Sequence, residues 1–425
     1  MSKEQQKITK RELLKFSGAA VVGMALAAVA PKRGRADEGR YKTHLPLVPN
    51  EFNFDKEKNS WPWVEAGPPV KVKEGEEKDG IRAANVSSDG EMIIAGTWHH
   101  GLWGKLKGEW RVLSEENPVG VNRHILMIDK NIPQYTTEGV RAVMVADRGL
   151  QVLKEKEGDF TVETIHFPDS FALDFAQTGY LLENGELLIG GGGGIVKAGS
   201  WEKGQFDWQP LGPPIMVRTI EVNPHNPDEI YGGGWWGHSG WEKDEEGKIK
   251  PGAGVWRTED GGRKWEQVLK EINVNCLWIH PENPQIVVAG TEGAGDQSTR
   301  KPEESYPSLF FSLDKGNNWM PLRPNPWVYD LITPQQAFVY HDGHLYISCW
   351  GGPVYRVELP SEISWEGLNS LNWELLGQTN SKKDFFAGHL SLSGGEKRPT
   401  LWTGSKRYWD KVPPSFTPLS SLVMV

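Results

Sequence analysis

Two short stretches of this sequence share one pattern and decide the fold. Residues 258–265 read TEDGGRKW and residues 312–319 read SLDKGNNW, so both fit S/T-x-D-x-G-x-x-W. In such a turn the Asp carboxylate can accept backbone N–H groups, Gly can take a positive φ, and Trp can pack between sheets. Each copy follows a second shared stretch, NPHNPDEIYGG at 223–233 and HPENPQIVVAG at 280–290. Because the two stretches keep their order and nearly their spacing, they mark a structural repeat.

The S/T-x-D-x-G-x-x-W pattern resembles the Asp-box of the sialidase-like, or BNR-repeat, β-propellers, which include VPS10-like receptors. The resemblance implies an all-β propeller built from such units. It also implies that Asp260 and Asp314 brace their turns and do not catalyse, because turn aspartates usually serve the backbone. Propellers of this kind include glycoside hydrolases, polysaccharide lyases, sorting receptors and assembly factors, so the resemblance leaves the function open.

Weaker copies of the same unit extend over the rest of the chain. Asp-Gly or Asn-Gly pairs join alternating apolar runs within 81–114, 174–211 and 332–376, and such pairs are typical of hairpin turns. The intervals 121–166 and 384–410 are poorer copies. We therefore predict a seven-bladed β-propeller over residues 81–425; a six-bladed ring with an extra terminal domain is the alternative.

Residues 37–80 are predicted to be an N-terminal extension that supplies one strand of the ring. The last unit lacks a convincing outer strand, whereas SWPWVE at 60–65 reads as a strand without a partner. Adding this segment to the last unit would remove the exposed edges of the first and last blades.

Residues 1–36 are predicted to be an export signal peptide. The sequence TKRELLK at 9–15 precedes the mostly small, apolar run FSGAAVVGMALAAVA at 16–30. This run is short for a transmembrane helix and fits a signal core. The stretch before it resembles the twin-arginine export motif, with Lys10 in place of the first arginine. The resemblance implies a periplasmic or secreted protein with no membrane span after signal removal; an uncleaved anchor is the alternative.

Composition excludes several classes of protein. The 425 residues are 38% hydrophobic and contain 49 Gly and 29 Pro, which excludes a disordered chain and favours short elements joined by turns. Only 2 Cys are present, so the protein is not a disulfide scaffold, and pairing of Cys276 with Cys349 is left open. The net charge is −9 although the first 36 residues are basic, which predicts no nucleic-acid partner.

Alignment of the innermost strands on their turns predicts a group of polar residues around the channel mouth. They share one position within otherwise apolar strands: Arg82, Arg123, Thr178, Arg218, Asn275, Gln336 and His389. Three of them are arginines, and guanidinium groups can hold a carboxylate, sulfate or phosphate. The alternative is that strand ends are wet and simply tolerate polar residues.

The ends of the second strands add further candidate ligand-binding residues on the same side. They are Trp98, Arg148, Trp235, Trp236 and Trp350. Tryptophan beside polar groups suits a sugar ring, which presents apolar CH faces together with hydroxyls. Packing between blades is the alternative role for each Trp. The predicted ligand is an anionic glycan or another small anion.

Candidate catalytic residues depend on the class of reaction. For a glycoside hydrolase, Glu292 and Asp296 are the acidic residues best placed on this side. For a polysaccharide lyase, His100 or His238 would be the base, and the arginines would neutralise a uronate. Sialidase activity itself is not expected, because the family's R-I-P motif is absent and its Tyr/Glu pair has no counterpart.

The sequence indicates no cofactor and no metal site. No fixed ligand spacing links the histidines, and there is no haem attachment motif, P-loop or dinucleotide fingerprint. Two hypotheses of function follow. The first is a carbohydrate-active protein that binds an anionic glycan, as a hydrolase or lyase if it is an enzyme. The second is a noncatalytic periplasmic propeller that binds a protein partner or assists assembly of an exported complex.

Overall fold

The computed structural model describes most of the chain from residue 81 onward, together with two residues before it. The described ranges are 64–65, 81–97, 101–129, 132–170, 173, 175–199, 201, 205–213, 215–235, 252–270, 272–291, 309–322, 337–348, 353–360, 362–378, 385–393, 400–407 and 419–423. The predicted signal peptide, residues 1–36, lies outside these ranges, as does almost all of the predicted extension, residues 37–80.

Six antiparallel sheets are each formed by four consecutive strands, which makes them blades. Blade 1 contains β2 (Ile81–Val86), β3 (Met92–Thr97), β4 (Leu102–Leu106) and β5 (Glu109–Ser114). Blade 2 contains β6 (Asn122–Met127), β7 (Val140–Ala146), β8 (Gly149–Lys156) and β9 (Asp159–His166). Blade 3 contains β10 (Thr178–Leu181), β11 (Leu187–Gly191), β12 (Gly194–Ala198) and β13 (Trp208–Gly212).

The other three blades follow in chain order. Blade 4 contains β14 (Met216–Val222), β15 (Ile230–Trp235), β16 (Gly254–Thr258) and β17 (Glu266–Lys270). Blade 5 contains β18 (Val274–Ile279), β19 (Val287–Thr291), β20 (Leu309–Ser312) and β21 (Met320–Leu322). Blade 6 contains β22 (Phe338–His341), β23 (His344–Ser348), β24 (Pro353–Glu358) and β25 (Trp373–Gln378).

A further four-stranded sheet combines the two ends of the described chain. Its order is β1-β28-β27-β26, formed by β1 (Val64–Glu65), β28 (Leu419–Val423), β27 (Thr400–Arg407) and β26 (Phe385–Ser393). Strand β26 contacts β2 of blade 1 on one side and β22 and β23 of blade 6 on the other. Two short helices, α3 (Pro133–Thr136) and α4 (Trp365–Leu368), lie in connections within blades 2 and 6.

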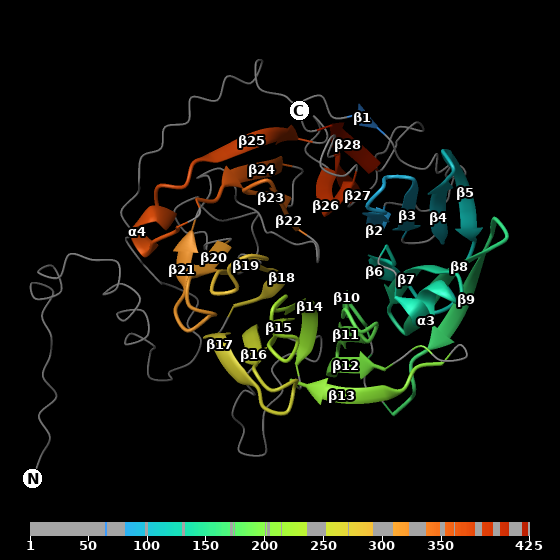
Figure 1. The fold of residues 1–425 in the computed structure, drawn as a ribbon, viewed down its shortest axis with the longest axis horizontal. Coiled ribbons are helices and arrows are strands. Elements are labelled where there is room, and N and C mark those ends of the chain that lie inside the picture. Colours follow the sequence, from blue (N-terminus) through green and yellow to red (C-terminus); the bar gives the residue numbers. More distant parts are fainter. Residues whose placement is uncertain are drawn as a thin grey trace, which may run out of the picture.

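The sheets are arranged around a common centre, with the first strand of each blade innermost (Figure 1). The all-β propeller predicted from the repeats is thereby confirmed for six four-stranded blades. We call the side on which the innermost strands begin the mouth face. The opposite side, where the first and second strands of each blade are joined, is the turn face.

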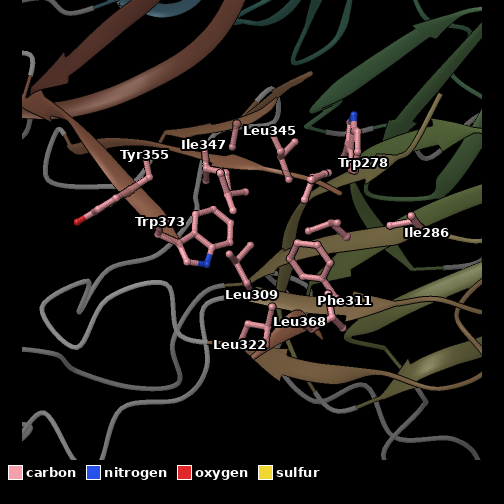
Figure 2. Close-up of a cluster of buried hydrophobic side chains, with 14 of the residues drawn as sticks. Trp278, Ile286, Leu309, Phe311, Leu322, Leu345, Ile347, Tyr355, Leu368 and Trp373 are labelled. Atoms are coloured by element: carbon pink, nitrogen blue, oxygen red, sulfur yellow. The ribbon is translucent and has the colours of Figure 1, made fainter. Parts of the chain in front are cut away.

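The hydrophobic core lies between neighbouring blades. One cluster joins blades 5 and 6, where Trp278 and Phe311 of blade 5 face Leu345 and Trp373 of blade 6 (Figure 2). Similar clusters join blades 1 and 2, blades 2 and 3, and blades 3 and 4. Because a propeller sheet buries both of its faces, burial of apolar area between blades is the main stabilising term. Cys276 is buried in the first cluster, whereas Cys349 lies outside the described residues.

The two turns that identify the repeat lie between the third and fourth strands of blades 4 and 5, on the turn face. Asp260 Oδ1 accepts hydrogen bonds from the Lys264 backbone N–H at 2.9 Å and from the Thr258 hydroxyl at 2.8 Å, and these bonds lower the pKa of Asp260. Gly262 has a φ of 93°, as the pattern requires. Asp314 accepts from the Ser312 hydroxyl at 2.9 Å and from Asn318 N–H at 2.8 Å in the same way.

These turns also connect one blade to the preceding one. The Trp265 indole N–H donates to the carbonyl of Leu211 in β13 of blade 3, at 2.9 Å. Lys315, in the turn of blade 5, donates through Nζ to Glu229 of blade 4 at 2.7 Å. Glu229 is 1% exposed in its side chain and also accepts from the Tyr231 hydroxyl and the Asn223 amide. The repeat pattern therefore stabilises contacts between blades on the turn face.

The Trp265 hydrogen bond predicts a measurable difference between two tryptophans in equivalent turns. Trp265→Phe removes the bond to Leu211, whereas Trp319→Phe removes an indole N–H that has no hydrogen-bond partner among the described residues. We expect Trp265→Phe to lower the free energy of unfolding by about 1 kcal/mol more than Trp319→Phe. Denaturant unfolding of both variants measures this difference. Equal losses would contradict the assigned bond.

The Glu229 cluster predicts a pH dependence of stability. Burial raises the pKa of Glu229, but hydrogen bonds from Lys315, Tyr231 and Asn223 outweigh it and hold the pKa below the ordinary value of 4.5. A carboxyl whose pKa is lowered by folding stabilises the protein above its unfolded pKa, and this contribution is lost as the pH falls through the folded pKa. We expect Glu229→Gln to be less stable than wild type at pH 7, with a difference that shrinks below about pH 4.

Denaturant unfolding as a function of pH measures the Glu229 effect. Glu374→Gln is the matched control, because Glu374 is paired with Arg356 but its side chain is 44% exposed. An exposed pair of this kind contributes little to stability. A difference between Glu229→Gln and wild type that stays constant from pH 7 to pH 3 would rule out the assigned ionisation.

Candidate functional site

The innermost strands of blades 1, 2, 4 and 5 share an irregularity near their first residues on the mouth face. The register between first and second strands shifts at Arg82 in β2, at Arg123 in β6, at Arg218 in β14 and at Asn275 in β18. Each of these residues is the extra residue of a β-bulge, because both of its neighbours are paired and it is not. Bulges redirect a side chain out of the regular alternation of a strand.

The sequence alignment predicted that these four residues occupy the same position in their innermost strands. In the structure each of them is the bulge residue of its strand. In β26 the register shift lies between Ala387 and Leu390, so it includes His389. For Arg82 and His389 only the backbone position is described. The side chains of Arg123, Arg218 and Asn275 are described as well.

In blade 3 the residue at this position is one earlier than the sequence alignment predicted. Thr178 is paired with Gly190 without a register shift and forms the fourth pair from the hairpin turn, as Thr219 does in blade 4. The residue that corresponds to Arg218 is therefore Gln177, which is 3% exposed. The alignment missed it because the two hairpin turns differ in length, spanning 182–186 in blade 3 and 223–229 in blade 4.

Arg123 forms an ion pair at the mouth face of blade 2. Its Nε donates to Asp147 Oδ1 at 2.6 Å, and the two side chains are 13% and 16% exposed. The other carboxylate oxygen of Asp147 accepts the Val121 N–H at 3.0 Å. The pair thus fixes the start of β6, and the charge of Arg123 is largely offset by its partner. The positive charge of the predicted arginine group is correspondingly smaller.

Arg218 lies against an aromatic ring. Its guanidinium carbon is 4.5 Å from the ring centroid of Trp235, the last residue of β15. Such a cation–π contact orients the guanidinium and keeps its charge. Trp235 is half-buried, and its indole N–H has no hydrogen-bond partner among the described residues. A guanidinium, an aromatic ring and an indole N–H donor therefore lie together at the mouth face of blade 4.

Asn275 is the corresponding bulge residue of the neighbouring strand β18. It is 1% exposed, and neither its amide oxygen nor its amide nitrogen has a hydrogen-bond partner among the described residues. A buried polar group without a partner costs about 1–3 kcal/mol. The position is therefore suited to an ordered water or to a polar group of a ligand, which would supply both the missing donor and the missing acceptor.

Side chains next to the bulges connect neighbouring innermost strands. His124 Nδ1, in blade 2, accepts the Gly179 N–H of blade 3 at 2.8 Å. Thr219, at the equivalent position in blade 4, accepts the Leu277 N–H of blade 5 at 3.2 Å. His124 is 5% exposed, so it acts as a structural acceptor here. In the part of the chain that the structure describes, no group of three or more His, Cys, Asp or Glu could hold a metal ion.

One carboxyl of the described chain has a strongly raised pKa but lies away from this group of residues. Burial raises the pKa of Glu221 to about 8. Perturbed carboxyls of this kind are common at active sites. Glu221 is the last but one residue of β14, near the turn face, whereas Arg218 and Trp235 are on the mouth face. It does not join the candidate site.

The remaining sequence-predicted residues fall into two groups. Arg148 is exposed in the turn between β7 and β8, on the mouth face next to Asp147. Eight others lie outside the described residues: Trp98, His100, Trp236, His238, Glu292, Asp296, Gln336 and Trp350. Both sets of candidate catalytic residues are among these eight, so they stay predictions.

Comparison with known proteins indicates the fold alone. No family model matches the chain, and no curated protein matches its sequence. Among solved structures, the Pan2 WD40 domain of Neurospora crassa is similar at 12% identity with a TM-score of 0.52, covering 85% of this chain and 94% of that one. An ancestral GH74 enzyme is similar at 13% identity with a TM-score of 0.52, covering 82% of this chain and 48% of that one.

This chain thus spans about half the length of the GH74 enzyme. At such low identity these similarities support a β-propeller and carry no activity with them. No helix among the described residues has the length and apolar character needed to cross a membrane.

Proposed function

We propose that this protein binds an anionic carbohydrate at the centre of its mouth face, around Arg218, Trp235 and Asn275. The observation that carries the proposal is the contact between the Arg218 guanidinium and the Trp235 ring at a bulge of an innermost strand. Asn275 lies at the equivalent bulge of the next innermost strand, and β14 and β18 are in contact. Three groups of different chemistry therefore lie at one level of two neighbouring blades.

The three groups match the parts of an acidic sugar. A guanidinium binds a carboxylate or sulfate through paired N–H donors. An aromatic ring packs against the apolar CH face of a pyranose, and the indole N–H can donate to a hydroxyl. An amide that lacks partners can donate to one hydroxyl and accept from another. Binding of such a ligand would give hydrogen bonds to the Trp235 indole N–H and the Asn275 amide, which have none among the described residues.

The proposal also names catalytic residues for two possible reactions. If the bound glycan is hydrolysed, we propose Glu292 and Asp296 as the acidic pair. If a uronate is cleaved by elimination, we propose His100 or His238 as the base that removes the proton next to the carboxylate. The similarity to a GH74 enzyme agrees with a carbohydrate ligand but does not choose between these reactions.

A noncatalytic propeller that binds a protein partner, or assists assembly of an exported complex, is the second candidate. The observation that favours it is the Arg123–Asp147 ion pair, which offsets one of the predicted arginine charges and leaves a weaker anion site. In either case we propose that residues 1–36 direct export, so that the protein works in the periplasm or outside the cell.

We also propose that the sheet of β1 and β26–β28 is a seventh blade that closes the ring. Its support is the position of β26 between β2 and β22, and the pairing of Glu65 with Ser420 and of Val64 with Ser421. A strand from the start of the chain would then hold the last blade in place. In this arrangement the ring would be closed and every blade would pack between two neighbours.

The closing strand can be tested with an engineered disulfide. We expect Glu65→Cys with Ser420→Cys to form a cross-strand bond and to raise Tm in the absence of reductant, because the bond links residues far apart in sequence. Each single substitution is a control. A double variant that does not cross-link, or whose Tm is insensitive to reductant, would argue against the closing strand.

The ligand proposal predicts a ligand-dependent gain in stability. We expect glucuronate, galacturonate or a sulfated sugar to raise Tm of the wild type, by an amount corresponding to about 2.7 kcal/mol at one hundred times Kd. Arg218→Ala is expected to abolish the ligand-induced change. Arg141→Ala is the matched control, because this half-exposed arginine is the second residue of β7, near the turn face. A ligand-induced change that is equal in Arg218→Ala and wild type would exclude Arg218 from the site.

A further inference from the structure

An exposed phenylalanine on the mouth face adopts a backbone conformation that is rare for its residue type. Phe175 has a φ of 60°, in the left-handed region, and its side chain is 46% exposed. Among the described residues, Phe175 and Val112 are the exposed large hydrophobic side chains. A bulky residue in the left-handed region is strained and is found mostly where the surrounding structure or a function requires it.

The chain directly after Phe175 is held at three points. The Ala176 N–H donates to the carbonyl of Asp147 at 3.1 Å, and the Gln177 N–H donates to the carbonyl of Gly190 at 2.8 Å. The Gln177 amide in turn donates to the carbonyl of Phe175 at 3.0 Å. The backbone is thus anchored to blade 2 and to blade 3, while the Phe175 side chain is 46% exposed.

The position of this ring relates it to the candidate site. Gln177 occupies the position in blade 3 that Arg218 occupies in blade 4, so Phe175 lies two residues before the mouth-face level. Its anchor, Asp147, forms the ion pair with Arg123. Next to Asp147 is Arg148, which is exposed. One backbone hydrogen bond, from Ala176 to Asp147, thus joins blades 2 and 3. The exposed residues Phe175 and Arg148 are the sequence neighbours of its donor and its acceptor.

We propose that Phe175 and Arg148 form a second sugar-binding subsite, between blades 2 and 3 on the mouth face. This inference rests on the proposed function, because its ligand is a further residue of the same anionic glycan. Phe175 packs against the CH face of that sugar, and Arg148 pairs with its carboxylate or sulfate. The left-handed backbone at Phe175 is the kind of local strain that structures keep at ligand-binding positions.

The subsite makes the protein a binder of oligosaccharides. A single acidic sugar can occupy the group around Arg218 and Trp235 alone, whereas a longer chain reaches both groups. Loss of Phe175 is therefore expected to weaken binding of an oligosaccharide and to leave binding of a monosaccharide unchanged. Loss of Arg218 is expected to weaken both.

The test compares variants by calorimetric titration with galacturonate, a tetragalacturonate and a sulfated tetrasaccharide. We expect Phe175→Gly to lower the affinity for the tetrasaccharides at least about tenfold, and Arg148→Ala to lower it similarly. Phe175→Tyr keeps the ring and is expected to keep the affinity. Val112→Ala is the matched control, because Val112 is the other exposed hydrophobic residue and lies in the outer strand β5.

Stability provides a second readout. Glycine adopts a φ of 60° without strain, so Phe175→Gly is expected to leave Tm unchanged or to raise it. Retained stability with lost affinity would show that the ring serves the ligand. A marked fall in Tm would instead assign Phe175 to the fold and would overturn the subsite.

The titrations also separate this inference from the proposed function. If wild type binds the tetrasaccharides and Phe175→Gly binds them equally well, the second subsite is wrong and the Arg218 site stands. If wild type binds none of the three sugars, both proposals fail.

Discussion

Side-chain direction in a β-strand is the constraint on which the candidate site depends. Alternate residues of a strand point to opposite faces of the sheet, and in this propeller neighbouring blades cover both faces of the innermost strands. A regular innermost strand can therefore offer side chains only to the core. The bulges at Arg123, Arg218 and Asn275 interrupt this alternation at the mouth face. They let the same strands carry an apolar core and, at one level, polar groups that a ligand can use.

The hydrogen bonds of the repeat turns and the candidate site lie on opposite faces of the propeller. On the turn face, Trp265 and Lys315 bind the preceding blade by hydrogen bonds, and Glu229 is almost fully buried. On the mouth face, the Asn275 amide has no hydrogen-bond partner among the described residues, and Phe175 has a strained backbone. The Asn275 amide and the Phe175 backbone thus carry their cost on the mouth face, whereas the hydrogen bonds of Trp265 and Lys315 stabilise the fold from the turn face. This separation is why substitutions on the turn face are expected to change stability without changing the binding groups.

The sequence predicted the parts of the molecule that repeat. The two Asp-box turns and the Asp-Gly pairs marked the blades, and polar residues in apolar strands marked the bulge level at Arg123, Arg218 and Asn275. It missed Gln177 because turn lengths differ, and it missed Asp147 and Phe175 because loop residues follow no period. A signal was present in the sequence for Asp147, since an acidic residue directly precedes Arg148 at the strand exit. The candidate catalytic residues lie outside the described residues and stay predictions.

Electrostatics decides what kind of anion such a protein can bind. The chain has a net charge of −9, so it repels an anionic ligand at distances where its overall charge acts. The Debye length at physiological salt is about 8 Å, so this repulsion is screened while short contacts are kept. Affinity must then come from groups in direct contact with the ligand: the Arg218 guanidinium, the Trp235 ring and the Asn275 amide. A bare phosphate or sulfate can accept from all three groups, but it offers no CH face to the Trp235 ring and, when fully ionised, no donor to the Asn275 amide oxygen; an acidic sugar offers both. The proposed site would therefore select for the sugar that carries the charge, and long-range attraction would contribute little to recognition.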